Sequence, residues 1–151
     1  MTPYFPMFIN LENKKILVVG AGTIATRRIK ALMKFGASLR VVAPIFSPEL
    51  SGLEGVDMIN RGYQPEDLEG IDIAVIATDN ATLNEEIGKE CEERGILKNI
   101  SSDQSKCDFF FPSTIITDDV VIGINSGGKD PGLTKRTRLK IEKMLVKGGD
   151  D

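Results

Sequence analysis

Two glycines and an alanine at fixed spacing are the first residues in this sequence that could do chemistry. Gly20, Gly22 and Ala25 form the pattern G-x-G-x-x-A within the stretch KILVVGAGTIATRRIKALMKFGA. In a turn between a strand and a helix, the first glycine permits a tight bend and the second lets the backbone approach a diphosphate. The small third residue lets the helix pack on the strand. The same pattern is also an ordinary glycine turn, so its surroundings decide between the two interpretations.

The residues around this motif predict a buried strand before it and an amphipathic helix after it. The apolar run 16–19 ends at the glycines, as a buried parallel strand would. Residues 23–35 place apolar side chains at roughly helical spacing, and Gly36 stands where a helix would end. Backbone amides at the start of such a helix can face an anion. This context favours nucleotide binding over a plain glycine turn.

Strands and helices alternate from residue 15 to about residue 102. Further strands are predicted at 38–44, 56–63, 71–79 and 96–102, and helices at 47–53 and 80–95, the last capped by Asn80. Such alternation is typical of a parallel sheet with helices on both faces. The predicted fold class is therefore α/β, with a Rossmann-like, doubly wound parallel sheet.

The pattern changes after residue 108. Residues 109–128 predict two strands joined by a turn at 117–119, then a glycine-rich loop, and Asp130 and Pro131 predict the start of a basic helix. A hairpin and one helix bury too little apolar surface to be stable alone. We therefore predict two domains, 1–108 and 109–151. The second, a small α+β region, should pack on the first or on a second copy of the chain.

Composition narrows the classes of function. The chain has 151 residues, of which 41% are hydrophobic, and a formal net charge of −3, so we expect a folded protein without a nucleic-acid partner. It has no histidine and two cysteines, so we expect no disulfide framework and no metal site. The N-terminus lacks a signal-peptide pattern, and no apolar run approaches the roughly 20 residues of a membrane span. We expect a cytoplasmic protein with no membrane contact.

One part of the dinucleotide pattern is missing. An acidic residue normally ends the second strand and binds a ribose hydroxyl. Here that strand ends with Val42, Ala43 and Pro44. Contacts to an adenosine would therefore come from the backbone or from nearby side chains.

Four stretches spread over nearly the whole chain carry a family signature. They are MFINLENKKILVVGAGTIATRRIKALMKFGASLRVVAP, ATDNATLNEEI, NISSDQSKCDFFFPS and INSGGKDPGLTKRTRLKIE. In this order they resemble precorrin-2 dehydrogenase, the NAD-dependent and sometimes iron-chelating module of sirohaem synthases. The elements C-D-F-x-F-P and S-G-G-x-x-P are much more specific than a glycine turn.

The resemblance implies that precorrin-2 is oxidised to sirohydrochlorin with NAD⁺ accepting a hydride, and that some relatives also insert ferrous iron. It implies an NAD-binding Rossmann domain and a dimerisation region through which two chains entwine. The expected partners are thus precorrin-2 and a second copy of the chain. Matching positions place NAD on the following residues: Gly20, Gly22, Thr23, Ile24, Pro44, Ile45, Thr78 and Asp79.

The expected catalytic residues depart from the family pattern. Relatives carry an aspartate, the proposed general base, three residues after an asparagine that matches Asn99, itself expected at the substrate site. This chain has Ser102 there and Asp103 next. A serine cannot replace a carboxylate as a base at neutral pH without an activating partner. Either Asp103 reaches the site, or the acid is less needed, or the chain is a non-catalytic NAD-binding sensor or regulatory module. An ordinary solvated loop is the alternative for Asp103.

A loop before the last predicted helix is the expected binding site for the carboxylates of precorrin-2. Ser126, Gly127, Gly128 and Lys129 offer backbone and side-chain donors there. The alternative is that Asn125 and Ser126 only satisfy the backbone of a turn.

Two other residues have alternative interpretations. Asp79 could border the cofactor crevice or cap the helix that follows it. Cys107 is predicted to be a buried thiol rather than a ligand.

Overall fold

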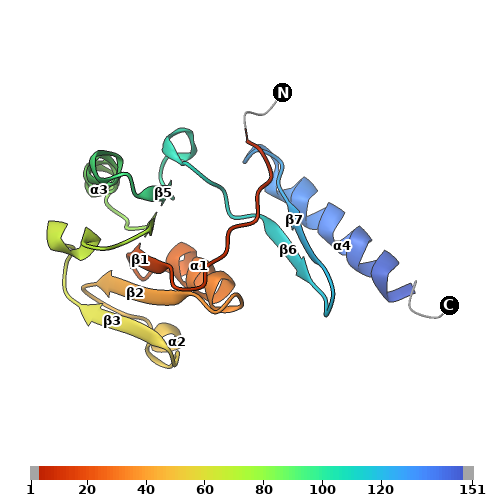
Figure 1. The fold of residues 1–151 in the computed structure, drawn as a ribbon, viewed down its shortest axis with the longest axis horizontal. Helices are drawn as coiled ribbons and strands as arrows, with labels where there is room; N and C mark the ends of the chain where they lie inside the picture. The colour runs from red at the N-terminus through yellow and green to blue at the C-terminus, as the bar shows by residue number, and fades with distance from the viewer. Residues whose placement is uncertain (1–3, 148–151) are drawn as a thin grey trace. The chain divides into compact units, whose positions relative to one another are not determined.

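The computed structural model describes residues 4–147 and divides into two compact units (Figure 1). We call Ile9–Phe109 the sheet unit. The hairpin unit joins the described residues before Ile9 to those from Phe110 onward.

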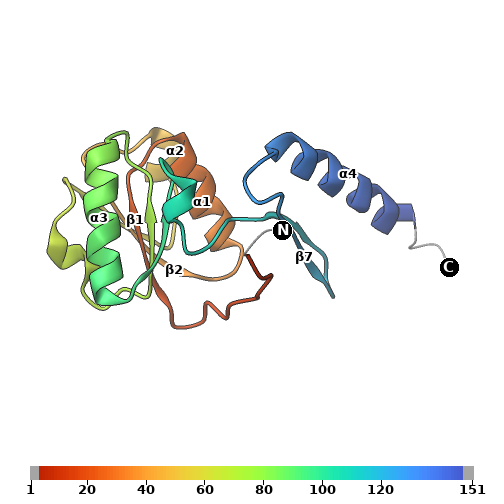
Figure 2. The same cartoon turned by 90° about the horizontal axis from the view of Figure 1, so that it is seen from above.

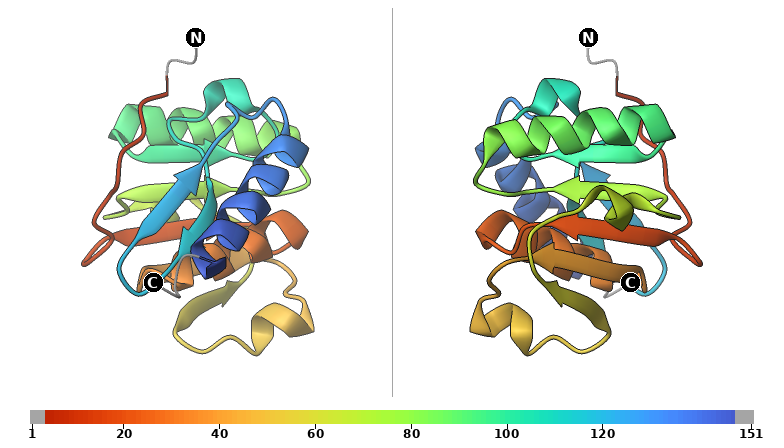
Figure 3. Two further views of the ribbon diagram at one scale, coloured as in Figure 1. Left: turned by 90° about the vertical axis from the view of Figure 1, so that its right-hand side faces the viewer. Right: turned by 90° about the vertical axis from the view of Figure 1, so that its left-hand side faces the viewer.

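The sheet unit contains a five-stranded parallel sheet in the order β3-β2-β1-β4-β5. The right-hand view of Figure 3 shows the strands stacked in this order, with β5 uppermost. This arrangement confirms the predicted doubly wound, Rossmann-like class. The strands are β1 (Lys15–Val19), β2 (Ser38–Ala43), β3 (Val56–Asn60), β4 (Ile73–Ile76) and β5 (Leu97–Ile100).

Helices cover both faces of this sheet. Figure 2 shows α1 (Thr23–Met33) and α2 (Pro48–Ser51) on one side and α3 (Ala81–Arg94) on the other. The chain therefore leaves the neighbouring strands β1 and β4 toward opposite faces. In open α/β sheets, ligands bind at the carboxyl ends of the strands where the connections diverge in this way.

The core of the sheet unit is apolar on both faces of the sheet, as continuous hydrophobic strands require. Leu17, Val18 and Val75 are buried in the central strands, and Ala25 and Ile29 of α1 are buried too. The buried Ala25 is the small third residue of the G-x-G-x-x-A pattern, and its size allows the helix to approach the sheet closely.

The ends of the predicted helices follow the sequence signals. Asn80 caps α3, because its side-chain oxygen accepts the backbone N–H of Leu83 at 3.1 Å. Gly95 ends the helix with a φ of 67°, a left-handed conformation that glycine adopts without steric cost.

Two short 3-10 turns were not predicted. They are η1 (Pro65–Leu68) and η2 (Gln104–Lys106). Asp67 closes η1 by accepting the backbone N–H of Gln64 at 2.8 Å, and its carboxylate also binds both terminal nitrogens of Arg61. These turns depend on side-chain contacts rather than on apolar periodicity, so a hydrophobic pattern does not reveal them.

A buried lysine ties the last strand of the sheet to the chain that follows it. The Lys98 ammonium lies 3.2 Å from Asp108 and 3.0 Å from Glu92. Asp108 also accepts the backbone N–H of Lys98 at 2.9 Å. Burial by itself would lower the pKa of Lys98, but hydrogen bonds to Glu92 and Asp108 outweigh it and raise that pKa. The ammonium therefore stays charged inside the fold.

The hairpin unit contains two antiparallel strands and a long helix. The strands β6 (Ser113–Ile116) and β7 (Val121–Ile124) pair around the predicted turn, and α4 (Pro131–Lys147) lies alongside them (Figure 1). The rings of Tyr4 and Phe110 pack with centroids 4.1 Å apart. Across residues 4–147, no helix has the length and apolar character needed to cross a membrane.

Candidate functional site

The two glycines of the motif differ in what the protein itself requires of them. Gly20 has a φ of 105°, and a Cβ there would lie 2.3 Å from the carbonyl oxygen of Ala77. Its backbone N–H donates to the carbonyl of Val42 at 2.9 Å. Gly20 thus allows the turn after β1 to pass between the ends of β2 and β4, and no other residue fits there without strain.

Gly22, in contrast, has no such requirement within the protein. Its φ of −78° is open to any residue, and a Cβ there would meet no protein atom within 4 Å. The absent side chain leaves space outside the protein surface at the first turn of α1. A phosphate group that approaches the backbone closely needs this space.

The start of α1 has the character of an anion site. Gly22 is the N-cap, no side chain caps the helix, and its first turn contains no acidic residue. The hydroxyl of Thr26 donates to the carbonyl of Gly22 at 2.9 Å, away from the amides. The first N–H groups of a helix and its dipole together attract negative charge. The residues present therefore fit the diphosphate of a dinucleotide.

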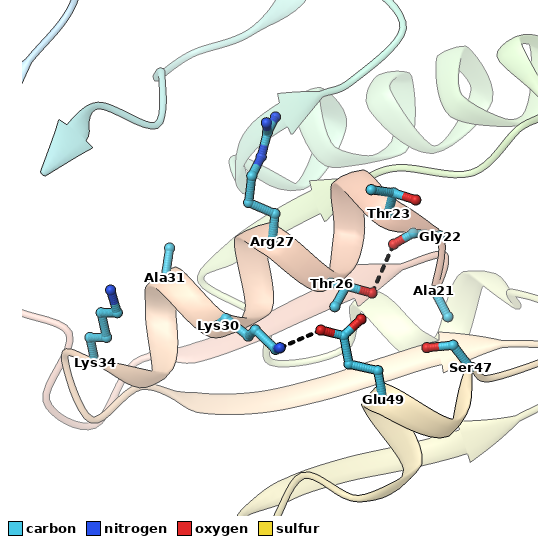
Figure 4. A pocket seen from close by; sticks show the side chains of 10 residues that line it. All are labelled: Ala21, Gly22, Thr23, Thr26, Arg27, Lys30, Ala31, Lys34, Ser47 and Glu49. Carbon is cyan, nitrogen blue, oxygen red and sulfur yellow. Dashed lines mark hydrogen bonds and ion pairs between the residues drawn. The ribbon is translucent and has the colours of Figure 1, made fainter. Parts of the chain in front are cut away.

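A hollow of about 600 Å³ extends from this corner along α1 toward α2. Ser47 and Glu49 line it from α2 and its N-cap, and Figure 4 shows Ser47 near Ala21, just before α1, and Glu49 beside Thr26 and Lys30. Glu49 forms an ion pair with Lys30 of α1. Pro44 and Ile45, predicted cofactor contacts, follow the end of β2, and the Ile45 side chain is 79% exposed.

A hydrogen-bond network joins the carboxyl ends of β4 and β5. Asn84, fully buried in the first turn of α3, donates to the hydroxyl of Ser102 at 3.2 Å and to the carbonyl of Thr78 at 3.1 Å. Its side-chain oxygen accepts the Thr78 hydroxyl at 2.5 Å. The predicted residues Thr78 and Ser102 therefore meet at one edge of the sheet, beside the turn at Gly20.

The sequence interpretation did not include Asn84, Ser47 or Glu49. Asn84 lies with Ile87, Gly88 and Cys91 on the buried side of α3. A polar residue at a core position of an amphipathic helix is a signal that could have identified Asn84.

The two acidic candidates lie in exposed or half-exposed loops. Asn80, not Asp79, caps α3, so the alternative capping role for Asp79 was wrong. Asp103 caps η2 by accepting the backbone N–H and the hydroxyl of Ser105 through one oxygen, at 3.0 and 2.6 Å. These hydrogen bonds lower the pKa of Asp103, so its carboxyl group is ionised at neutral pH. Its second oxygen faces Lys106 at 3.9 Å.

Asn99 and Cys107 are buried together behind this edge. The amide of Asn99 donates to the carbonyl of Phe109 at 2.8 Å. The Cys107 sulfur accepts the backbone N–H of Ile100 at 3.1 Å, and burial raises the pKa of its thiol. The predicted buried thiol is confirmed. The contacts of Asn99 give it a structural role, and its contact with a substrate stays a prediction.

The glycine-rich loop belongs to the hairpin unit. Asn125 accepts the N–H of Gly127 at 2.9 Å, and Ser126 bonds to the backbone of Asp130. Asp130 caps α4 as predicted, accepting the N–H of Leu133 at 2.8 Å. Gly127 and Gly128 both have positive φ values, 67° and 76°. The turn is thus satisfied by its own side chains, and carboxylate binding by residues 126–129 stays a prediction.

A metal site was not expected from the sequence. Among the residues that the structure describes, no group of three or more His, Cys, Asp or Glu side chains could hold a metal ion. Asp108, which follows Cys107, pairs with Lys98.

Fold and site together define a dinucleotide-binding protein of the Rossmann class. A family model described as "Putative NAD(P)-binding" matches residues 7–113. The chain belongs to this NAD(P)-binding family, so a nicotinamide cofactor is its expected ligand class.

The comparisons with individual proteins agree with the resemblance seen in the motifs. The siroheme synthase of Baumannia cicadellinicola subsp. Homalodisca coagulata is 39% identical over 145 residues, which cover 94% of this chain and 31% of that protein. That of Photorhabdus laumondii subsp. laumondii is 38% identical with the same coverage. A solved structure of "SirC, precorrin-2 dehydrogenase" is 29% identical with a TM-score of 0.77, covering 93% of this chain and 70% of that one. The family resemblance is confirmed, and the chain spans about 31% of the length of these synthases.

Proposed function

We propose that this chain is an NAD-dependent dehydrogenase that oxidises precorrin-2 to sirohydrochlorin. The observation that carries the proposal is the open corner at Gly22, where an uncapped helix start fits a diphosphate beside the joined ends of β4 and β5. The similarity to siroheme synthases and to a precorrin-2 dehydrogenase supplies the substrate class.

The reaction removes a hydride and a proton from the substrate, and NAD⁺ when bound supplies the hydride acceptor. We propose that the amides of Gly22, Thr23 and Ile24 hold the diphosphate, and that Gly20 shapes the turn. Exposed Ile45 beside Pro44 would offer an apolar surface to the adenosine half. Thr78 and Asp79, at the end of β4, would border the nicotinamide half of the crevice.

We propose that Asp103 accepts the proton. Its second carboxylate oxygen lacks the two Ser105 contacts of the first, and the group is half-exposed and ionised. Asp103→Asn keeps the oxygen that caps η2 and removes the charge, so it should lower kcat with little loss of stability. Unchanged turnover in this variant would leave Asp103 with its capping role alone.

The test of the reaction itself is turnover under anaerobic conditions. Purified protein with precorrin-2 and NAD⁺ should form NADH and sirohydrochlorin in equal amounts. A parallel run with ferrous iron as second substrate measures whether the same chain also inserts the metal. Absence of NADH with authentic substrate, while NAD⁺ binds, would contradict the dehydrogenase and favour a non-catalytic NAD-binding module.

We propose NAD rather than NADP as the cofactor. Glu49 stands in the hollow that begins at Gly22 and is held there by Lys30, while the strand end itself lacks an acid. Figure 4 shows Arg27 directed away from Glu49 and Lys34 at the far end of α1. The Glu49 carboxylate can accept a hydrogen bond from a ribose hydroxyl of NAD, whereas a phosphate on that ribose would have to displace Glu49 from Lys30.

Affinities measured by calorimetry test this choice. Wild type should bind NAD⁺ about tenfold or more tightly than NADP⁺, which corresponds to about 1.4 kcal/mol. Glu49→Lys should reduce this preference for NAD⁺ over NADP⁺ or reverse it. Glu54→Lys, the same charge change at an exposed residue outside the hollow, is the control. Equal affinities in wild type would contradict the assignment.

We also propose that the hairpin unit forms a homodimer with its copy in a second chain. This small unit exposes large apolar side chains of the kind that interfaces cover. Met144→Glu should shift the sedimentation of the protein toward the monomer, whereas Lys143→Glu on the same helix should not. A wild-type monomer at micromolar concentration would contradict the proposal. The exposed apolar side chains of this unit are Phe5, Met7, Phe8, Ile116, Val120, Leu133, Leu139, Met144 and Leu145.

A further inference from the structure

A fully buried asparagine stands at the edge of the sheet where the reaction is proposed to occur. Asn84 has no exposed surface and makes four polar contacts, three with Thr78 and one with Ser102. A buried amide is costly unless its donors and acceptors are satisfied. The side chain is therefore held in one position by these partners.

The orientation of this amide follows from the backbone of Thr78. The N–H of Thr78 can only donate, and it lies 3.3 Å from the Asn84 oxygen. The carbonyl of Thr78 can only accept, and it lies 3.1 Å from the Asn84 nitrogen. Both backbone groups thus require the same placement of the amide oxygen and nitrogen. The second N–H of the same amide nitrogen faces Ser102.

The consequence for Ser102 is a fixed direction of its hydrogen bond. The Asn84 nitrogen is a donor only, so the Ser102 oxygen accepts this bond at 3.2 Å. The hydroxyl proton of Ser102 must then point elsewhere, and the Ser102 side chain is exposed. Ser102 therefore offers a hydrogen-bond donor to whatever lies at the carboxyl edge of β5.

We propose that Asn84 is a positioning residue that fixes Ser102 as a donor to a carboxylate of the tetrapyrrole substrate. The inference rests on the proposed function for the identity of the ligand. A serine already engaged as an acceptor has no role as a base, whereas a donor suits a polyanionic substrate. Ser102 therefore contributes to substrate affinity rather than to proton transfer.

The test separates substrate affinity from turnover. The Kd of sirohydrochlorin, measured by absorbance titration, reports affinity whether or not the chain turns over, and kcat is measured with precorrin-2. Ser102→Ala should raise Kd and KM about tenfold, the size expected for one hydrogen bond to a charged group. Its kcat should stay within about threefold, and Ser102→Thr should restore affinity. Ser101→Ala, one residue away, is the control.

A second variant tests the role of Asn84 directly. In Asn84→Asp the carboxylate cannot donate to Ser102, so the Ser102 hydroxyl turns inward to donate to it. Kd should rise as in Ser102→Ala, although Ser102 is present, and the double variant should be no weaker than Asn84→Asp. If Asn84→Asp does not fold, Ser102→Ala and Ser102→Thr still decide the donor role.

The outcomes of the two proposals are distinct. If wild type turns over and Ser102→Ala lowers kcat at unchanged Kd and KM, or leaves all three unchanged, the donor role is overturned. If wild type binds sirohydrochlorin but forms no NADH, the proposed function fails, and the titrations alone then support or overturn the donor role. If wild type does not bind sirohydrochlorin, both proposals fail.

Discussion

Replacing Gly22 by aspartate should stabilise the fold and abolish cofactor binding at once. The N-cap backbone is extended, with φ −78° and ψ −173°, and a Cβ would meet nothing within 4 Å. An aspartate at this position can accept an N–H of the first turn of α1. Helix α1 has no side-chain cap and no acid in its first turn, so the aspartate would add both a capping hydrogen bond and a favourable charge.

The expected gain in stability has three parts. Aspartate is a better N-cap than glycine by a few tenths of a kcal/mol. A negative charge at the start of a helix adds about 0.3–1 kcal/mol. Loss of the freedom of glycine in the unfolded chain adds about 0.4–1 kcal/mol. We therefore expect Gly22→Asp to raise the free energy of unfolding by about 1–2 kcal/mol.

The aspartate carboxylate would occupy the space that the diphosphate needs. It would also accept one of the backbone N–H groups that would otherwise bind the diphosphate. Charge repulsion and the lost amide should weaken NAD⁺ binding by about 100-fold or more, which corresponds to about 2.8 kcal/mol. Stability and affinity should thus move in opposite directions. If the fold itself required glycine at position 22, Gly22→Asp would lower the stability. No protein atom lies within 4 Å of a Cβ there, so we do not expect that result.

Thermal unfolding with and without NAD⁺ measures both effects. Wild type should be stabilised by about 2.7 kcal/mol at a ligand concentration of about 100 Kd. Gly22→Asp should melt about 2–6 °C higher without ligand and should not respond to it. Gly20→Ala is the contrasting variant and should be destabilised by about 2 kcal/mol or more, because its Cβ would clash with Ala77. Wild-type NAD⁺ affinity in Gly22→Asp would refute the reasoning.

Two ion pairs, each with one buried partner, give further expectations. Hydrogen bonds from Arg61 lower the pKa of Asp67 below 3.8, so their stabilisation is complete above pH 3.8 and is lost as pH falls through the lower folded value. Asp67→Asn should therefore be less stable at neutral pH and less acid-sensitive, as urea unfolding at a series of pH values will measure. In Asp108→Asn, the Lys98 ammonium keeps its ion pair with Glu92 only. The Lys98 side chain is 5% exposed, whereas that of Glu92 is 62% exposed. The substitution should lower the free energy of unfolding by about 2 kcal/mol, below the full cost of an unpaired buried charge, and an unchanged urea midpoint would contradict this.

Much of the sheet unit was predictable because its central strands are short apolar runs that end at glycine, proline or polar residues. Buried strands such as Lys15–Val19 and Ile73–Ile76 must be apolar on both faces, and that requirement is visible in the sequence. Gly20 and Ala25 were also predictable, since a tight turn and a close helix leave few alternatives.

The details of the site were less predictable, because they depend on contacts between distant residues. Whether Asp79 or Asn80 caps α3 is decided by one backbone conformation, and either residue type can cap a helix. The bond between Asn84 and Ser102 joins residues 18 positions apart through the pairing of β4 with β5. The pairing of Lys98 with Asp108 likewise needs the fold before it can be seen.

The central claim is that the backbone amides at the start of α1 bind the diphosphate of NAD. A crystal structure of the protein grown with NAD⁺ tests it most directly. The account predicts phosphate oxygens within hydrogen-bond distance of the N–H groups of Gly22, Thr23 and Ile24, with the adenosine near Ile45 and Glu49. NAD⁺ bound elsewhere on the chain, with this corner closed by protein atoms, would contradict the account.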